Sequence, residues 1–288
     1  GYTTKIEKDV VISTWQSIYK MPRKYFDQFG CVIGDEAHMF KAKSLTGIMT
    51  KMHHCRYRFG LTGTLDGTQT HQLVLEGLFG AVEKVVTTKQ LIDKNTLAKL
   101  KIKCVILKHN KIKEKMTYAE EMDYLVSKES RNNFILDLCN TINGNTLCLF
   151  QLVEKHGKIL YDGMKDKENV YFVYGGTDTD QREKIRGLVE GHKRSTTIAS
   201  YGTFSTGINI RNINNIVLAS PSKSKIRVLQ SIGRGLRTSS TKDSILVYDI
   251  ADDISYNERR NFTLNHFTER LNIYNEEQFD YDISKVKL

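Results

Sequence analysis

Short apolar runs alternate with longer amphipathic stretches along most of the chain. The runs are rich in β-branched residues and nearly continuous, which is typical of strands covered on both faces of a parallel sheet. The helical segments between them predict an α/β fold, in which helical crossovers connect parallel strands. The expected strands are Val10–Ser13, Cys31–Gly34, Tyr57–Leu61, Thr146–Phe150, Val170–Val173, Thr196–Ala199, Asn215–Ala219 and Ser244–Tyr248.

This pattern weakens in a lysine-rich, proline-free stretch between Val85 and Lys115 and resumes near Tyr118. A chain of 288 residues is long enough for two domains of ordinary size. The acidic and aromatic sequence after Asn257 predicts a helix that packs back on the body. The expected limits are residues 1–100 for the first domain, 101–117 for a linker, 118–255 for the second domain and 256–288 for a C-terminal helical tail.

Two adjacent carboxylates follow one of the expected strands, in the sequence Gly34-Asp35-Glu36-Ala37-His38. Open α/β sheets bind ligands at the carboxyl edge, where these side chains would lie. Asp35 could hold Mg²⁺, which prefers hard oxygen ligands. Glu36 could orient or deprotonate a water that attacks a γ-phosphate. An Asp-Glu pair is also common on inert surfaces, and a lone histidine such as His38 is more often structural.

A second candidate is Gln230-Ser231-Ile232-Gly233-Arg234-Gly235-Leu236-Arg237. On a helix, Gln230, Arg234 and Arg237 share one face, while Val228, Ile232 and neighbouring apolar residues form a separate stripe. Arginine presents a fixed fork of donors that suits a triphosphate. A solvated basic helix would explain the charges, but it would explain neither the glutamine nor the two glycines.

Two small, hydroxyl-rich loops lie between these motifs. One is Leu61-Thr62-Gly63-Thr64, and the other runs from Ser200 to Asn209 and includes Gly207. Hydroxyls and glycine amides in such loops can bind the phosphates of a nucleotide or of a nucleic acid. A plain turn is the alternative for each loop taken singly.

The order and spacing of these motifs resemble motifs II, III, V and VI of the superfamily 2 helicases. Ser13–Ser17 resembles motif Ib, Leu149–Gln151 resembles motif IV, and Tyr174–Thr177 resembles the segment between motifs IV and V. The resemblance extends from about Val10 to Arg237. Within the superfamily, the chain most resembles the phage helicases of recombination and branch migration.

This resemblance implies two RecA-like domains with parallel sheets, with ATP bound between them and nucleic acid across both. By motif position it assigns Mg²⁺ to Asp35 and the general base to Glu36. It assigns coupling near the γ-phosphate to His38 and Gln230, and phosphate contacts to Arg234 and Arg237. The remaining implied positions are Gly207 and Asn209 beside the nucleotide, and Thr14, Thr62, Thr64, Gly175 and Ser200 on the nucleic-acid side or on the path that couples it to ATP.

Three features depart from the family pattern. The motif III sequence differs from that of the RNA-processing DEAH-box proteins, and Asn209 stands where many members carry Asp. No G-x-x-x-x-G-K-[ST] loop occurs in the sequence. We therefore expect the first domain to be incomplete at its N-terminus, and the 288 residues alone to hydrolyse ATP poorly.

Charge and cysteine content bear on partners and location. The formal net charge is +10, and residues 191–242 contain nine basic and no acidic side chains. Such windows attract polyanions. The family resemblance implies that this partner is DNA, forked or branched, with RNA as the alternative. A non-catalytic nucleic-acid-binding module remains an alternative of another class. No apolar run is long enough to span a bilayer. The five scattered cysteines fit a reducing compartment such as the cytoplasm.

Overall fold

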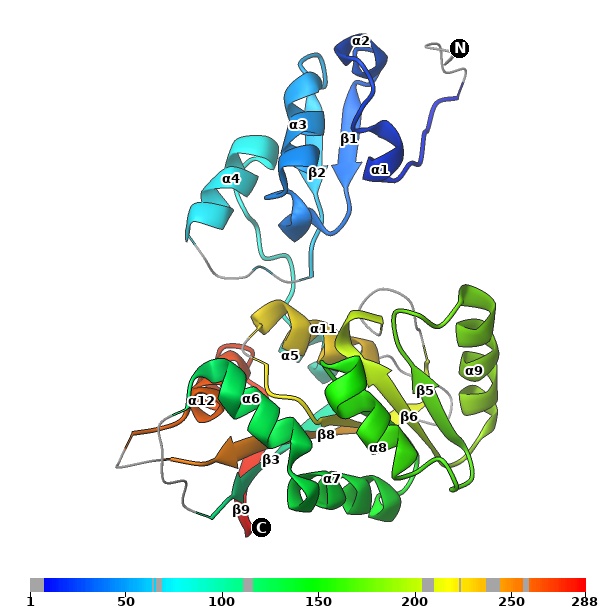
Figure 1. Ribbon diagram of the computed structural model, residues 1–288. Helices are drawn as coiled ribbons and strands as arrows, with labels where there is room; N and C mark the ends of the chain where they lie inside the picture. The colour runs from blue at the N-terminus through cyan, green and yellow to red at the C-terminus, as the bar shows by residue number, and fades with distance from the viewer. Residues whose placement is uncertain are drawn as a thin grey trace. The chain divides into compact units, whose positions relative to one another are not determined.

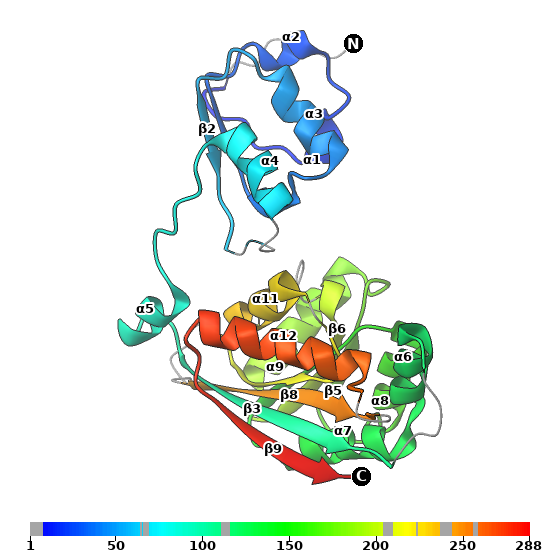
Figure 2. The same cartoon turned by 90° about the vertical axis from the view of Figure 1, so that its left-hand side faces the viewer.

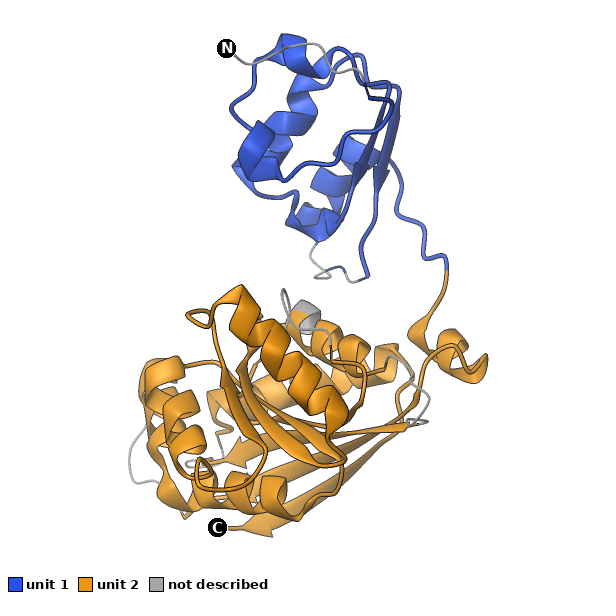
Figure 3. Ribbon diagram, turned by 90° about the vertical axis from the view of Figure 1, so that its right-hand side faces the viewer, with its two compact units in different colours: residues 1–85 blue, residues 86–288 orange. Residues whose placement is uncertain are grey.

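The chain divides into two compact units, residues 1–85 and residues 86–288, in a computed structural model (Figure 3). The structure describes residues 8–63, 65, 69–110, 116–203, 210–222, 224–236, 244–255 and 259–288. None of the helices within these ranges has the length and apolar character needed to cross a bilayer.

Unit 1 is built around two parallel strands, β1 and β2, which pair from Cys31↔Tyr57 to Gly34↔Gly60. Its buried core includes Phe26, Met49 and other apolar side chains from the flanking helices. In chain order its elements are α1 (Trp15–Ile18), α2 (Arg23–Phe26), β1 (Cys31–Gly34), η1 (Ala37–Met39), α3 (Lys43–Lys51), β2 (Tyr57–Gly60) and α4 (Gln69–Phe79).

The two glycines that end these strands are explained by close packing. A Cβ atom on Gly34 would lie 2.9 Å from the ring of Phe40, and one on Gly60 would lie 3.0 Å from Phe79 and from Ala37. The missing side chains therefore let η1 and α4 approach the carboxyl edge of the sheet.

Unit 2 contains a seven-stranded sheet with the order β5-β6-β4-β7-β8-β3-β9 (Figure 1). Every neighbouring pair in it is parallel. Its elements are α5 (Thr88–Asp93), β3 (Lys99–Lys108), α6 (Tyr118–Ser127), α7 (Glu129–Thr141), β4 (Asn145–Phe150), the π-helix η2 (Val153–Gly157), α8 (Lys158–Asp162), β5 (Val170–Val173), α9 (Thr179–Gly191), β6 (Ser195–Ser200), β7 (Ile213–Leu218), α11 (Lys225–Gly235), β8 (Ser244–Asp253), α12 (Phe262–Glu276) and β9 (Tyr281–Lys287).

Helices cover both faces of this sheet. Apolar side chains of α9, α11 and α12, among them Val189, Ile232 and Tyr274, pack in one buried cluster. Those of α7 and α8, among them Ile135 and Leu160, pack in a second cluster on the other face. Figure 2 shows α12 lying along β8 and β3. The result is a three-layer α/β/α unit, which confirms the predicted α/β class with parallel sheets of RecA-like type.

Three expectations from the sequence differ from the structure. Residues 101–108, expected within a linker, belong to β3, which lies between β8 and β9. Lysines alternate with the buried Leu100 and Ile102 at the start of β3, and residues 104–107 are all buried, so the segment is a strand of the sheet rather than a connection. The expected helical tail includes α12 but also ends in the strand β9. Residues 10–13 form no strand, and Val10 and Ile12 are exposed.

Candidate functional site

The carboxylate motif and the Thr-Gly motif lie side by side at the carboxyl edge of the unit 1 sheet. Asp35 follows β1 directly, and Leu61 follows β2. The amide of Leu61 donates to the carbonyl of Gly34 at 2.8 Å, and the amide of Ala37 donates to the carbonyl of Leu61 at 2.8 Å. These backbone bonds hold the two loops against each other beyond the last strand pair.

A side-chain contact also connects the two loops. His38 Nδ1 lies 2.9 Å from Thr62 Oγ1 and 3.3 Å from Glu36 Oε2. The imidazole is buried, whereas Glu36 is exposed. His38 therefore contacts both a carboxylate of the first motif and a hydroxyl of the second.

Glu36 adopts the left-handed conformation, with φ 50° and ψ 50°. Such a backbone costs a non-glycine residue about 1–3 kcal/mol and clusters at functional sites. The Glu36 amide donates to Asp35 Oδ1 at 2.9 Å, which fixes the neighbouring carboxylate. Both side chains are exposed at the sheet edge, where a bound ligand could reach them.

The positions of Asp35 and Glu36 bear on the predicted Mg²⁺ site. In the described part of the chain, no group of three His, Cys, Asp or Glu side chains is placed to hold a metal ion. Mg²⁺ usually takes only one or two protein carboxylates and completes its shell with waters and substrate phosphates. The exposed carboxylate of Asp35, with one oxygen already oriented by a backbone amide, fits that kind of site.

Of the two remaining candidate residues in unit 1, Thr14 and Thr64, Thr14 alone is among the described residues. Thr14 precedes α1, is exposed, and lies with its Oγ1 3.0 Å from Ser17 Oγ. This hydroxyl pair sits on a separate segment from the carboxylate and Thr-Gly loops. Thr64 lies outside the described residues.

In unit 2, Gln230 and Arg234 lie one turn apart on α11, as predicted, and both are partly exposed. The predicted apolar stripe is buried, with Val228, Ile232 and Leu236 nearly inaccessible. A Cβ on Gly235 would collide with Ile245, which explains that glycine. Gly233 meets no such neighbour, and its presence has no explanation in the structure. Arg237, Gly207 and Asn209 lie outside the described residues.

Ser200 and Gly175 lie near the carboxyl edge of the unit 2 sheet. Ser200 ends β6, and its Oγ lies 2.8 Å from Thr203 Oγ1. Gly175 follows β5, and its carbonyl accepts a bond from Arg182 Nη2 at 3.1 Å. Ser200 therefore ends β6 and Gly175 lies just beyond β5, and these two strands are paired in one sheet.

Sequence reasoning missed the buried ion pairs that support this edge. Arg270 donates to Asp249, which also accepts from the Tyr274 hydroxyl at 2.8 Å. Burial and the Asp249 charge raise the pKa of Tyr274 well above its usual value, so the hydroxyl stays protonated. The local sequence carries no signal for this contact, because its members come from different elements.

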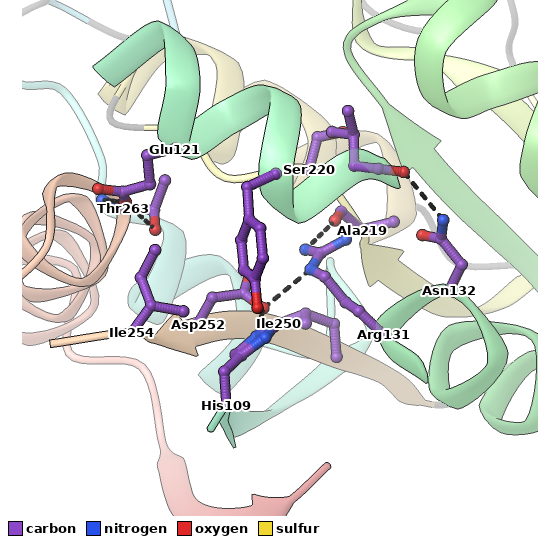
Figure 4. Close-up of polar contacts among 12 residues, drawn as sticks. His109, Glu121, Arg131, Asn132, Ala219, Ser220, Ile250, Asp252, Ile254 and Thr263 are labelled. Carbon is purple, nitrogen blue, oxygen red and sulfur yellow. Dashed lines mark hydrogen bonds and ion pairs between the residues drawn. The ribbon is translucent and has the colours of Figure 1, made fainter. Parts of the chain in front are cut away.

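A second buried network joins Arg131, Asp252 and His109 (Figure 4). Arg131 Nε lies 2.8 Å and His109 Nε2 lies 2.9 Å from Asp252 Oδ1. Burial alone would raise the pKa of Asp252, but the Arg131 charge and the bond to His109 lower it below its usual value. The carboxylate is therefore ionised and connects β8, α7 and the end of β3.

Comparison with known proteins gives matches over most of the chain. Residues 119–239 match the family described as helicase conserved C-terminal domain, and residues 1–67 match type III restriction enzyme, res subunit. The ATP-dependent DNA helicase uvsW of Enterobacteria phage T4 is 35% identical over 303 aligned residues. The alignment covers 99% of this chain but only 60% of that relative.

Solved structures give the same result for the fold. The crystal structure of T4 UvsW matches with a TM-score of 0.57 at 34% identity, over 95% of this chain and 57% of that one. The type ISP restriction-modification enzyme LlaBIII bound to DNA gives 0.62 at 12% identity, over 95% and 23%. S. cerevisiae Dbp5 bound to RNA and ADP BeF3 gives 0.54 at 12% identity, over 89% and 59%. The last two matches show a shared fold alone.

Proposed function

The chain belongs to the superfamily 2 helicases, and from that premise we propose that it is the motor part of an ATP-dependent DNA helicase or translocase acting on forked or branched DNA. The observation that supports this most is the identity with a phage DNA helicase over 99% of the chain. The chain spans about 60% of that relative, so the activity of the whole protein is part of the proposal.

In unit 1, we assign the hydrolytic groups to the loop after β1. Glu36 acts as the general base for the attacking water, and its left-handed backbone holds it beside the oriented Asp35. Asp35 would hold Mg²⁺, which supplies positive charge beside the β- and γ-phosphates. His38 contacts both Glu36 and Thr62, so it relays the state of the carboxylate loop to the Thr-Gly loop.

In unit 2, we assign phosphate recognition to α11. Arg234, with Arg237, stabilises the charge that develops on the transferred phosphoryl group, and Gln230 senses the same group. Gly207 and Asn209 contact the nucleotide beside them. Thr14, Thr64, Gly175 and Ser200 contact nucleic acid, or they contact residues that link the bound nucleic acid to the ATP site. Gly175 lies just after β5 and Ser200 is the last residue of β6, and these positions at strand ends support that role.

The 288 residues contain no phosphate-binding loop of the G-x-x-x-x-G-K-[ST] type. Hydrolysis in this class requires the β- and γ-phosphates to be held by a glycine-rich loop and its lysine, and the motif does not occur in the 288 residues. We therefore propose that these residues alone hydrolyse ATP slowly, although they contain the base, the metal ligand and the arginines. The cytoplasmic location expected from the cysteines stays a prediction.

The test measures ATP hydrolysis by the protein encoded by the complete gene, with forked DNA, linear DNA and RNA of matched length and with none. We expect forked DNA to stimulate hydrolysis most. The Glu36→Gln variant is the control for contaminating ATPase. Stronger stimulation by RNA would favour the RNA-dependent alternative, for which recognition of 2′-hydroxyls is the physical basis. Binding of DNA without any hydrolysis would favour a non-catalytic module.

A further inference from the structure

The segment Ala219–Ser222, here called the β7–α11 junction, connects β7 to α11 and is bound along its length by other elements. The Ala219 amide donates to the Leu149 carbonyl at 3.0 Å, and the Ala219 carbonyl accepts from Arg131 Nη2 at 2.7 Å (Figure 4). The Ser222 carbonyl accepts from the buried Arg270 Nη1 at 3.1 Å. Two buried arginines therefore fix the backbone of a connecting segment.

Ser220 is the centre of this junction. Its Oγ accepts a bond from the Gln151 amide at 3.1 Å and lies 2.9 Å from His156 Nδ1. Its carbonyl accepts from the Tyr201 hydroxyl at 3.0 Å. One buried serine thus contacts the segment after β4, the π-helix η2 and the residue next to Ser200. Ser200 is among the residues that the proposed function places on the nucleic-acid side, and Gln151 belongs to the segment that resembles motif IV.

His156 is a buried and neutral partner for this serine. It lies on η2, a π-helix, and such helices are rare and frequently occur at functional sites. Its side chain is inaccessible, and burial together with the Arg131 charge lowers its pKa to about 3. A neutral imidazole offers one donor and one acceptor nitrogen, so its contact with Ser220 does not change across the physiological pH range.

On its other side, the junction fixes the start of α11. The Ser224 amide donates to Ser222 Oγ at 3.3 Å, and Ser224 caps the helix by accepting from the Arg227 amide. Arg227 Nη1 reaches Gln151 Oε1 at 3.3 Å, and its guanidinium lies 5.4 Å from the Tyr201 ring centroid. Gln230 and Arg234 follow on the same helix. One small polar network therefore joins Gln151 and Tyr201, which lie at strand ends, to α11, the helix that carries the proposed phosphate contacts.

We propose that Ser220 and His156 are positioning residues that couple nucleic acid at the carboxyl edge of unit 2 to the ATP-facing helix α11. This inference rests on the proposed function. The hydroxyl and carbonyl of Ser220 and the carbonyl of Ala219 are all hydrogen-bonded, and satisfied buried polar groups of this kind hold their segments rigidly. Nucleic acid that shifts Gln151 or Ser200 therefore shifts α11, and with it Gln230 and Arg234. Without the Ser220 hydroxyl, the Gln151 amide and His156 lose their shared partner, and the two regions move independently.

The test replaces Ser220 by Ala in the complete protein and measures ATP hydrolysis with and without saturating forked DNA. The stimulation factor should fall by at least about fivefold, the lower end of usual coupling between sites, while the rate without DNA stays within about twofold. The variant His156→Phe keeps a ring but removes the nitrogen that contacts Ser220, so it breaks the same contact from the other side and should give the same loss. It carries the test alone if Ser220→Ala does not fold, as judged by thermal unfolding.

Ser195→Ala is the matched control. Ser195 is a buried serine at the opposite end of β6, and its hydroxyl donates to Asn145 Oδ1 at 2.7 Å. It should keep the full stimulation factor. An equal loss in Ser195→Ala would show a general loss of packing and would overturn the coupling role.

Two further outcomes are decisive. If the wild-type protein shows no stimulation by any nucleic acid, the proposed function itself is wrong, and the positioning role falls with it. If the wild type is stimulated but folded Ser220→Ala and His156→Phe keep the stimulation factor, or change only the DNA concentration needed for half-maximal stimulation, the proposed function stands and the coupling role is wrong.

Discussion

The two parallel sheets of this chain are covered to very different extents. In unit 2, every residue of β4 and β6 is buried between two helical layers. In unit 1, Cys31, Ile33, Tyr57 and Phe59 occupy one face of the β1–β2 pair and are exposed, Ile33 by 64% and Phe59 by 53%. Parallel strands normally occur in sheets covered on both faces, so unit 1 presents one covered face and one open apolar face.

The two units therefore differ in the buried contacts that stabilise them. Unit 2 encloses two apolar clusters and several buried ion pairs within its own elements. In the described part of unit 1, one apolar cluster packs against two short strands. Contiguous apolar surface of that kind usually marks a contact with another segment or protein.

The same contrast holds for the candidate chemistry. Asp35 and Glu36 in unit 1 are exposed on a strained loop, whereas unit 2 positions α11 through buried side chains such as Arg270 and Arg131. The proposed general base and metal ligand therefore lie in the less enclosed unit, and the proposed phosphate-sensing helix lies in the more enclosed one.

The largest expected effect concerns α11. Arg234→Ala in the complete protein should lower the ATP hydrolysis rate by about 10³-fold or more, because the guanidinium acts on charge that develops in the transition state. Arg234→Lys should not restore the rate, since an ammonium does not reproduce the planar fork of donors. Single-turnover hydrolysis separates this effect from ATP binding. Full activity with lysine would show that α11 supplies only a general positive charge.

The next effect concerns unit 1. Glu36→Gln should keep ATP binding and lower hydrolysis by roughly 10²–10⁴-fold, the usual contribution of a general base. Equilibrium binding of a fluorescent ATP analogue, measured beside the hydrolysis rate, distinguishes the two steps. Unchanged turnover would remove Glu36 from the chemistry and leave the carboxylate loop as a structural feature of a weakly enclosed unit.

Limited proteolysis tests the comparison of stability directly. In the 288-residue chain, unit 1 should be cleaved at least about tenfold faster than unit 2, because cleavage follows the population of locally open states. Mass spectrometry of the surviving fragment should give a product that begins near Val86 and retains β3 and β9. Slower loss of unit 1 would mean that its open face does not reduce its stability.

A smaller effect is expected from overpacking beneath α11. Gly235→Ala places a Cβ against Ile245 and Ile216 and should destabilise unit 2 by about 1–3 kcal/mol. Gly233→Ala is the matched control, because a Cβ there meets no atom within 4 Å. Chemical denaturation of the two variants gives the difference. Equal stabilities would show that α11 can move away from β7 and β8 without cost.

The smallest effect is the pH dependence that His156 adds to unit 2. Its pKa is about 3 when folded, below the usual value near 6.5, so the unfolded chain binds the proton more readily. Its contribution to stability is present above pH 6.5 and is lost as the pH falls, by about 1.4 kcal/mol between pH 7.5 and 5.5. His156→Gln should flatten that part of the curve. An unchanged slope in His156→Gln would contradict the buried neutral imidazole.

Local sequence determined much of the fold and of the candidate site. Cys31–Gly34 and Val170–Val173 are strands with the predicted limits, and α6 begins at Tyr118. The stripe of Val228 and Ile232 is buried, and Gln230 and Arg234 share a helix. These features depend on residue spacing within one element, which the periodicities of strands and helices make readable.

Only the tertiary structure decided which segments pair and which buried groups meet. Lys99–Lys108 reads locally as a charged connection, but pairing with β8 and β9 makes it a strand of the unit 2 sheet. Ser220 meets His156 across 64 positions and Gln151 across 69 positions of the sequence. Pairing and burial depend on contacts between segments far apart in the chain, and no local pattern of hydrophobic and polar residues contains those contacts.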